Sequence, residues 1–294
     1  MSHDFISKEV SEKAILRLIK LAAQHAGRMD NLVRVFLAAK EYMLETTHEI
    51  RILTRKCGVA WRILCQAGAD IDHHKSRKGL RFLRRCLGPL RDADIRLEEF
   101  ERFARNRKTG RNDTLSGVLQ QSWLQCYREA VAQVRQEWPK HRKTLKSIIK
   151  QSQHLTHVLG KLRWDKHDEH WLRKQWIKWK RSAGRTMDRK HLHVFRIKTK
   201  RLRYLSQFLL PHKAPAHLSA WLKQLDELQQ VLGRHRDLNN VVDWLSQLLE
   251  EISIKVDKLG NLSSSIQSLR KYCDQHIRRQ DGRLNKLRMK LFSK

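Results

Sequence analysis

Glycine, proline and negative charge are all scarce in this sequence. Its 294 residues include 12 Gly and 4 Pro, and only 30 Asp and Glu stand against 62 Lys and Arg. No run alternates Val, Ile or Thr with polar residues, which argues against an all-β fold and against an α/β fold built on glycine loops. The formal charge of +32 makes a polyanion the leading class of partner: a nucleic acid, a polyphosphate or an anionic membrane.

Cysteine pairs and long hydrophobic runs are also missing. The five cysteines are an odd number without a Cys-x-x-Cys spacing, so neither a disulfide framework nor a zinc knuckle is supported. The N-terminus has no apolar signal region, and no stretch approaches the roughly 18 uncharged apolar residues that a membrane span needs. We therefore expect a soluble cytoplasmic protein that does not insert into a membrane.

The hydrophobic residues that are present recur at helical spacing. Leu222, Leu225, Leu228 and Leu232 are one example of the three- and four-residue periodicity that predicts amphipathic helices. Between candidate breaks lie segments of about 15 to 35 residues, which predict an all-α protein of roughly ten helices joined by short loops. The candidate breaks are Gly27, residues 67–70, Gly88-Pro89, residues 106–112, Pro139, Gly160, Gly184, residues 211–215, Gly233 and Gly260.

Two sequence signatures each occur twice. The first, H-x-x-R-I-x-T-[RK]-[KR], begins at His48 and again at His193, and the second, L-G-x-x-R-D-x-[DN], begins at Leu87 and again at Leu232. Both repeats have the same offset, since 193 − 48 and 232 − 87 both equal 145. Two matches in the same order at one offset indicate a tandem duplication. We predict one domain over 1–294, with halves of about 8–140 and 141–294 that pack as pseudo-symmetric bundles and meet near Pro139.

The first signature places cations in a stripe. On a helix, His193, Arg196 and Lys200 fall within roughly 60° of one another, and the same holds for His48, Arg51 and Arg55. The second-half stripe is longer, because Arg185, Arg189 and Arg203 project into the same sector. In the first half Gly58 stands where the second has Arg203, although Arg62 extends the stripe. We therefore expect the second half to form the stronger site.

A solvated helix face is the ordinary explanation of a charge run. Like charges three or four residues apart repel, so such a stripe destabilises its helix unless an anion or carboxylates face it. Two features favour a binding role here. Apolar residues such as Phe195 and Ile197 flank the stripe on both sides, and the stripe recurs with its histidine at the duplicated position.

The second signature predicts a helix junction. Gly88 or Gly233 would end one helix, and Asp92 or Asp237 would begin the next, favouring the helix dipole and holding the arginines of the stripe. A metal site at Asp92 and Asp94 is less favoured, because the second copy has Asn239 and one carboxylate fewer. The expected structural and orienting set is Arg91, Asp92, Asp94, Arg236, Asp237 and Asn239.

Other chemistries find little support. The closely spaced histidines, such as His73-His74, do not recur at the 145-residue offset and lack a Cys partner or a His-Glu-x-x-His, so we expect no metal. Trp164, Trp171 and Trp179 have the spacing of core residues, although they could stack on single-stranded bases. No Walker A, Gly-x-Ser-x-Gly or Rossmann motif is present, so we expect no nucleotide enzyme and no cofactor.

From about residue 8 to 290, the duplicated pair of signatures resembles the CHAD family, and the segment His193 to Tyr204, HVFRIKTKRLRY, is the closest match. The resemblance implies two pseudo-symmetric helical bundles whose basic helix faces line a central groove or pore that binds inorganic polyphosphate. It also implies association with polyphosphate granules and no catalysis by the domain itself. The ligand set that it implies is His48, Arg51, Arg55, Lys56, His193, Arg196, Lys200, Arg201 and Arg203.

A dense line of Arg and Lys also suits a chain of phosphates on physical grounds, because guanidinium groups give bidentate contacts and ammonium groups act as point charges. The predicted polyphosphate-binding set adds Arg62, Arg185 and Arg189 to the residues above. The alternative is a helical nucleic-acid-binding protein, with competition between the two polyanions as the test. A polyphosphate or triphosphate hydrolase is less favoured, since paired acidic metal ligands are scarce.

Overall fold

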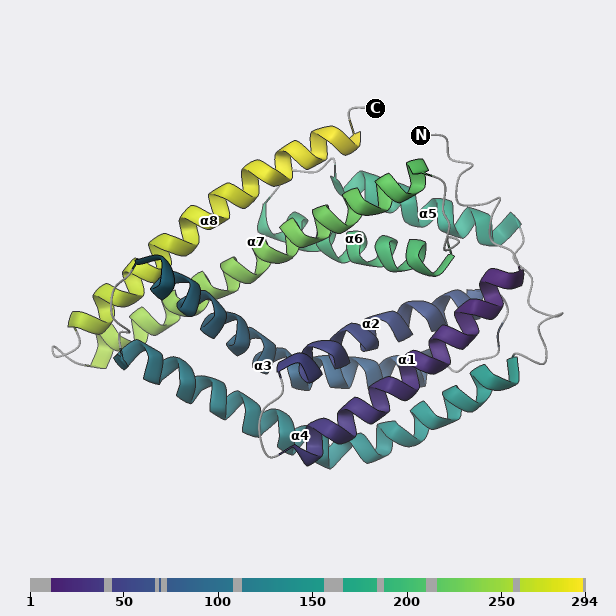
Figure 1. Cartoon of the computed structure of the whole chain (residues 1–294), viewed down its shortest axis with the longest axis horizontal. Helices are drawn as coiled ribbons and strands as arrows, with labels where there is room; N and C mark the ends of the chain where they lie inside the picture. Colours follow the sequence, from purple (N-terminus) through teal and green to yellow (C-terminus); the bar gives the residue numbers. More distant parts are fainter. Residues whose placement is uncertain are drawn as a thin grey trace. The chain divides into compact units, whose positions relative to one another are not determined.

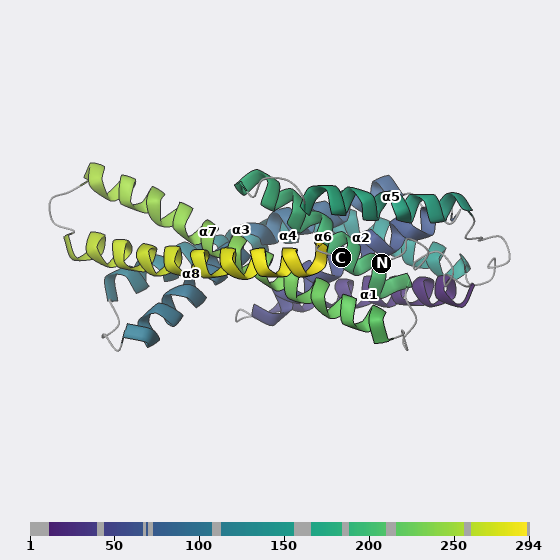
Figure 2. The same cartoon turned by 90° about the horizontal axis from the view of Figure 1, so that it is seen from above.

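The computed structural model describes residues 12–39, 44–66, 69, 73–107, 113–155, 166–183, 188–209, 216–255 and 260–292. These residues form eight α-helices and no strand (Figure 1, and turned by 90° in Figure 2). The prediction of an all-α protein is confirmed. The helices are α1 (Glu12–Ala38), α2 (Leu44–Gln66), α3 (His73–Arg107), α4 (Asp113–Leu155), α5 (Lys166–Ala183), α6 (Arg189–Leu209), α7 (Ala216–Lys255) and α8 (Gly260–Phe292).

Several predicted breaks are correct. Residues 67–70, 106–112 and 211–215 coincide with helix ends, α5 ends at Ala183 just before Gly184, and Gly260 is the first residue of α8. Gly160 lies outside the described residues.

Four other predicted breaks are wrong, because Gly27, Gly88-Pro89, Pro139 and Gly233 lie inside α1, α3, α4 and α7. A glycine costs a helix interior only about 1 kcal/mol, which the packing of a long helix can offset. A proline leaves the carbonyl of the residue four positions earlier without its helical partner. For Pro89 and Pro139 these residues are Arg85 and Arg135. Both are exposed, so water can hydrogen-bond their carbonyl groups.

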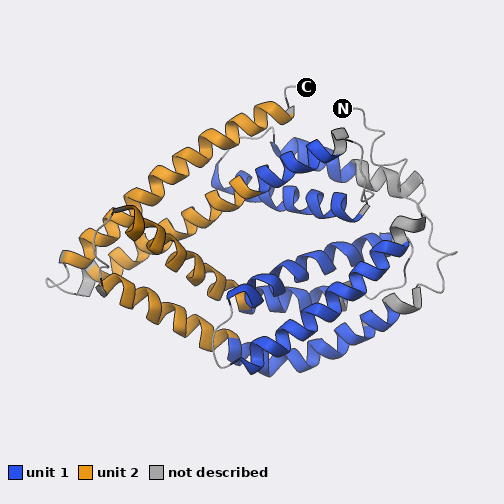
Figure 3. Ribbon diagram, in the orientation of Figure 1, with its two compact units in different colours: residues 1–86, 131–229, 294 blue, residues 87–130, 230–293 orange. Residues whose placement is uncertain are grey.

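The chain divides into two compact units (Figure 3). Unit 1 comprises residues 1–86, 131–229 and 294, and unit 2 comprises residues 87–130 and 230–293. Unit 1 therefore contains both copies of the first signature, and unit 2 contains both copies of the second. The division into two sequence halves, their pseudo-symmetry and a central groove stay predictions.

In unit 1, α1 packs on α2, α5 packs on α6, and α6 also contacts α1 and α2. Thr54 and Thr199, the threonines of the first signature, are fully buried. Thr54 Oγ1 donates to the carbonyl of Arg51 at 2.8 Å. Thr199 Oγ1 donates to the carbonyl of Phe195 at 2.9 Å and accepts a hydrogen bond from Nε1 of Trp179 at 2.9 Å. The repeated threonine thus serves helix packing.

Trp179 is a core residue, as its spacing predicts. It is 1% exposed and packs against Phe195 and Trp176. Trp164 lies outside the described residues, and the structure does not describe the side chain of Trp171.

Unit 2 has its own core, with side chains from α3, α4, α7 and α8. They include Ile95, Phe100, Phe103, Leu115, Leu119, Leu238, Val241, Leu245, Leu262, Ile266 and Leu269. The second signature lies in the interiors of α3 and α7, so the predicted helix junction is wrong: Asp92 and Asp237 are not at a helix N-terminus.

Residues of the second signature form hydrogen bonds inside unit 2, and one of these bonds joins two helices, α3 and α4. Asp94 is buried and accepts a hydrogen bond from Nε1 of Trp123 at 2.9 Å. Arg91 pairs with Glu98 at 2.9 Å, and the buried Asn239 donates from Nδ2 to the carbonyl of His235 at 2.8 Å. Arg236, Asp92 and Asp237 are half-buried, and a role in holding the arginines of the stripe stays a prediction.

A buried carboxylate organises arginines in unit 2. Glu99 is fully buried, accepts two hydrogen bonds from the guanidinium of Arg234, and pairs with Arg102 at 2.7 Å. We call Glu99, Arg102 and Arg234 the Glu99 cluster. Both arginines therefore have the same carboxylate as a partner within the protein, and the cluster keeps one positive charge in excess.

Candidate functional site

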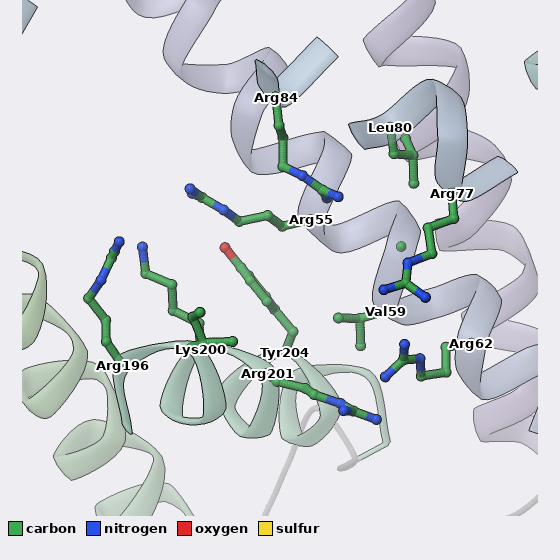
Figure 4. A pocket seen from close by; sticks show the side chains of 12 residues that line it. Arg55, Val59, Arg62, Arg77, Leu80, Arg84, Arg196, Lys200, Arg201 and Tyr204 are labelled. Carbon is green, nitrogen blue, oxygen red and sulfur yellow. The ribbon is translucent and has the colours of Figure 1, made fainter. Parts of the chain in front are cut away.

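Seven cations of unit 1 converge on a pocket of about 300 Å³ (Figure 4). Residues of α2, α3 and α6 line it, and no Asp or Glu is among them. We call this the basic pocket. Its lining residues are Arg55, Gly58, Val59, Arg62, Arg77, Leu80, Arg84, Arg196, Ile197, Lys200, Arg201 and Tyr204.

Helical spacing sets the positions of these cations. Arg55 and Arg62 on α2 are seven residues apart, as are Arg77 and Arg84 on α3, and seven residues make about two turns. Each pair therefore lies on one face of its helix. Figure 4 shows the side chains of these two helices on one side of the pocket and those of α6 on the other, with Lys200 and Tyr204 extending toward Arg55.

Gly58 lines the pocket without a side chain. A Cβ atom added to Gly58 would lie 3.4 Å from Cδ1 of Leu80, which is an ordinary van der Waals contact. A long basic side chain at position 58 would also extend into the space that the pocket occupies. The missing cation of the first half therefore leaves room beside Arg55 and Arg62.

The pocket concentrates positive charge that no lining residue neutralises. Burial, reinforced by the charges of Arg55, Arg81 and Arg77, lowers the pKa of Arg84 to about 10. Burial together with Arg62 and Arg77 lowers the pKa of Arg201 to about 10. Both shifts have the sign expected when guanidinium groups lose water and repel one another. An anion that entered the pocket would offset the repulsion between these guanidinium groups.

Two arginines brace the wall of the pocket. Nη1 of Arg51 donates to the carbonyl of Arg84 at 3.2 Å, and Nη1 of Arg84 donates to the carbonyl of Thr54 at 3.4 Å. This reciprocal contact ties α2 to α3. Arg51, a predicted binding residue, is therefore a bracing residue and is not part of the pocket lining.

Arg203 is also placed outside the pocket lining. Its Nη1 lies 2.9 Å from Oδ1 of Asp226, and its guanidinium stacks at 4.7 Å from the ring centre of Tyr204. The positions 145 residues earlier are Gly58 and Arg81, so the first half lacks both members of this ion pair. Arg203 therefore pairs with Asp226 and does not line the pocket, and the expectation of a stronger second-half site stays a prediction.

The other predicted residues divide into two groups. The structure brings Arg55, Arg62, Arg196, Lys200 and Arg201 together in the pocket. His48, Arg189 and His193 are exposed, Lys56 is half-buried, and none of these four lines the pocket. Arg185 lies outside the described residues.

Sequence reasoning missed Arg77, Arg84 and Tyr204. The two arginines of α3 have Leu222 and Gln229 at the 145-residue offset, so a search for repeated residues passes over them. Their seven-residue spacing within a helical segment was the available signal. Tyr204 is 3% exposed and resembles a core residue in the sequence, yet it lines the pocket.

Among the residues that the structure describes, no group of three or more His, Cys, Asp or Glu is arranged to hold a metal ion. No helix in the described ranges is both long and apolar enough to cross a membrane.

The chain matches one family and is similar to several solved structures, two of which follow. The sequence model of a family described as CHAD domain matches residues 22–246. The crystal structure of the CHAD domain from the plant Ricinus communis has a TM-score of 0.67 at 19% identity, covering 96% of this chain and 91% of that chain. PptA from Streptomyces chartreusis has a TM-score of 0.64 at 13% identity, covering 94% and 98%. No curated protein matches the sequence.

Proposed function

Because this chain belongs to the CHAD domain family, we propose that it binds inorganic polyphosphate and that the basic pocket is the binding site. The observation that carries the proposal is the convergence of seven Lys and Arg side chains on one pocket whose lining contains no carboxylate.

The pocket chemistry suits a flexible chain of phosphates. Arg55 and Arg62 span about 10 Å along α2, enough for more than one phosphate group to lie against the helix. Guanidinium groups bind phosphate oxygens in pairs, while the ammonium of Lys200 adds a mobile point charge. The hydroxyl of Tyr204 extends toward Arg55 and can donate a further hydrogen bond (Figure 4).

We propose binding without catalysis. Metal-assisted cleavage of a phosphoanhydride needs oxygen ligands for the metal beside the phosphates. The pocket lining offers no carboxylate for this purpose. A cytoplasmic protein that binds long chains in this way would collect at polyphosphate granules.

The test is a titration of labelled long-chain polyphosphate with the wild type and with Arg55→Gln/Lys200→Gln. Each charge-assisted hydrogen bond contributes about 1.5–3 kcal/mol, so the double variant should bind on the order of 100-fold more weakly. Lys20→Gln/Lys146→Gln, which removes two exposed cations from the same unit, is the matched control and should bind within about twofold of wild type.

Two results would contradict the proposal. One is equal affinity of the pocket variant and the control while circular dichroism shows both to be helical. The other is displacement of polyphosphate by duplex DNA at matched phosphate concentration, which would favour the nucleic-acid alternative. Affinity should also fall with added salt, because each phosphate contact releases counterions.

A further inference from the structure

A second concentration of positive charge lies on α8. This helix has eight Lys and Arg against two Asp, whereas α7 has four Lys and Arg against six Asp and Glu. The segment from Arg278 to Lys290 carries most of the excess. We call Arg278, Arg279, Arg283, Lys286 and Lys290 the α8 basic face.

These five residues are all exposed and share one side of the helix. At 100° per residue they fall within a sector of about 140°, and Arg279, Arg283, Lys286 and Lys290 fall within about 60°. The opposite side is buried at Leu284 and Leu287. The single acidic residue of the segment, Asp281, lies outside the sector and contacts Nε2 of His235 at 3.2 Å.

Four of the five charges on this face have no partner among the residues that the structure describes. Arg278, Arg279, Lys286 and Lys290 form no hydrogen bond or ion pair with any other residue that the structure describes. Arg279 and Arg283 are four residues apart, as are Lys286 and Lys290, and like charges at this spacing destabilise a helix. An external anion would remove that repulsion.

We propose that the α8 basic face is a second binding surface for inorganic polyphosphate, separate from the basic pocket. This inference rests on the proposed function. The pocket belongs to unit 1 and the α8 basic face to unit 2, and α8 lies beyond the segment that matches the family model, residues 22–246. The face extends about 18 Å along the helix, which suits a linear ligand.

The amino-acid composition of the α8 basic face favours polyphosphate over a nucleic acid or a membrane. Residues 278–290 contain no aromatic side chain on which a base could stack, as single-stranded nucleic acids require. A membrane would need an apolar face, and Met289, 71% exposed, is the one exposed apolar side chain in this segment. A row of Arg and Lys alone recognises charge density, which a polymer of phosphates supplies without bases or lipid.

Two separate surfaces would make the protein bivalent. One molecule can then hold two polyphosphate chains, or two segments of a long chain, and so join chains into a network. A variant that kept only the pocket would still bind polyphosphate but would no longer cross-link it.

The first measurement is light scattering of the full chain mixed with long-chain polyphosphate at fixed ionic strength. The α8 variant carries Arg278→Gln, Arg279→Gln, Lys286→Gln and Lys290→Gln. Its control carries Lys20→Gln, Arg128→Gln, Lys146→Gln and Lys180→Gln, four exposed cations from α1, α4 and α5. The α8 variant should lose most of the scattering and keep wild-type affinity for tripolyphosphate. Equal scattering by the two variants overturns the inference.

The second measurement locates the ligand on the wild-type protein and does not depend on any variant folding. Long-chain polyphosphate should protect Lys286 and Lys290 from acetylation, and should still do so in Arg55→Gln/Lys200→Gln. Absence of protection, or protection by duplex DNA but not by polyphosphate, overturns the inference. Failure of the proposed function gives a different result: Arg55→Gln/Lys200→Gln then binds tripolyphosphate as the wild type does.

Discussion

The basic pocket and the Glu99 cluster both contain several arginines, but only the Glu99 cluster places a carboxylate among them. In the Glu99 cluster, Arg234 and Arg102 meet a fully buried carboxylate. In the basic pocket, seven cations share a space that no carboxylate lines. Each arginine of the Glu99 cluster has a carboxylate partner within the cluster, whereas the lining of the basic pocket contains no carboxylate. Arginine content alone therefore does not distinguish the two regions, and the position of the carboxylates does.

The largest expected effect comes from removing the carboxylate of the Glu99 cluster. Glu99→Gln leaves two arginines beside a neutral side chain in unit 2, and removal of one member of a buried pair typically costs about 3–5 kcal/mol. The melting temperature should fall by about 10 °C. The variant should bind polyphosphate as the wild type does at a temperature where it is folded. A melting temperature equal to that of the wild type would show that the cluster contributes nothing to stability.

The second effect is the gain in stability when a phosphate chain binds the basic pocket. A chain that binds only the folded state at 100 times its Kd raises stability by about 2.7 kcal/mol. Orthophosphate at the same total phosphate and ionic strength should do less, since separate ions cannot bridge the cations as a linked chain does. Thermal melts with orthophosphate, tripolyphosphate and long-chain polyphosphate measure this. An equal shift for all three would argue against a clustered site.

A smaller effect separates two neighbouring arginines on α6. Arg201 lines the pocket, while Arg203 pairs with Asp226. Arg201→Gln should weaken polyphosphate binding about tenfold, the loss of roughly one charge-assisted contact. Arg203→Gln removes the same charge two residues away and should weaken it no more than about twofold. Equal losses, measured by titration, would indicate that the ligand senses only net charge.

The smallest effect is a pH dependence in unit 1. Burial, with Lys56 and Arg28 nearby, lowers the pKa of His25 to about 4 from its ordinary value of 6.5. The unfolded chain therefore takes up this proton first, so stability should decrease as pH falls from 6.5 toward 4 and level off below. His25→Gln should reduce the decrease in melting temperature by a few degrees. Parallel curves for the two proteins would mean that His25 does not contribute.

Sequence periodicity predicted the helical class because an apolar side chain every three or four residues has to be buried on one face. The sequence also identified five of the seven pocket cations: Arg55, Arg196, Lys200 and Arg201 lie on the repeated signature of α2 and α6, and Arg62 extends the stripe beyond it. Arg77 and Arg84 escaped because they lack repeated counterparts and reach the pocket only through the packing of α3 against α2. The breaks at Gly88-Pro89 and Gly233 were wrong because local propensity is a small term beside the burial of Leu87, Leu90 and Leu232.

Thr54 and Thr199 have a consequence for relatives of this protein. They are constant between the two copies, yet both are buried and hydrogen-bonded to their own helix, so they record a requirement of folding. Under the proposed function, the cations beside them are required for binding the ligand. A descendant that kept the threonines and the apolar positions but exchanged Arg55, Arg196, Lys200 and Arg201 is then expected to fold normally and to lose polyphosphate binding. The same short motif can therefore persist after binding is lost. Only its charged positions distinguish a relative that keeps the binding cations from one that has lost them.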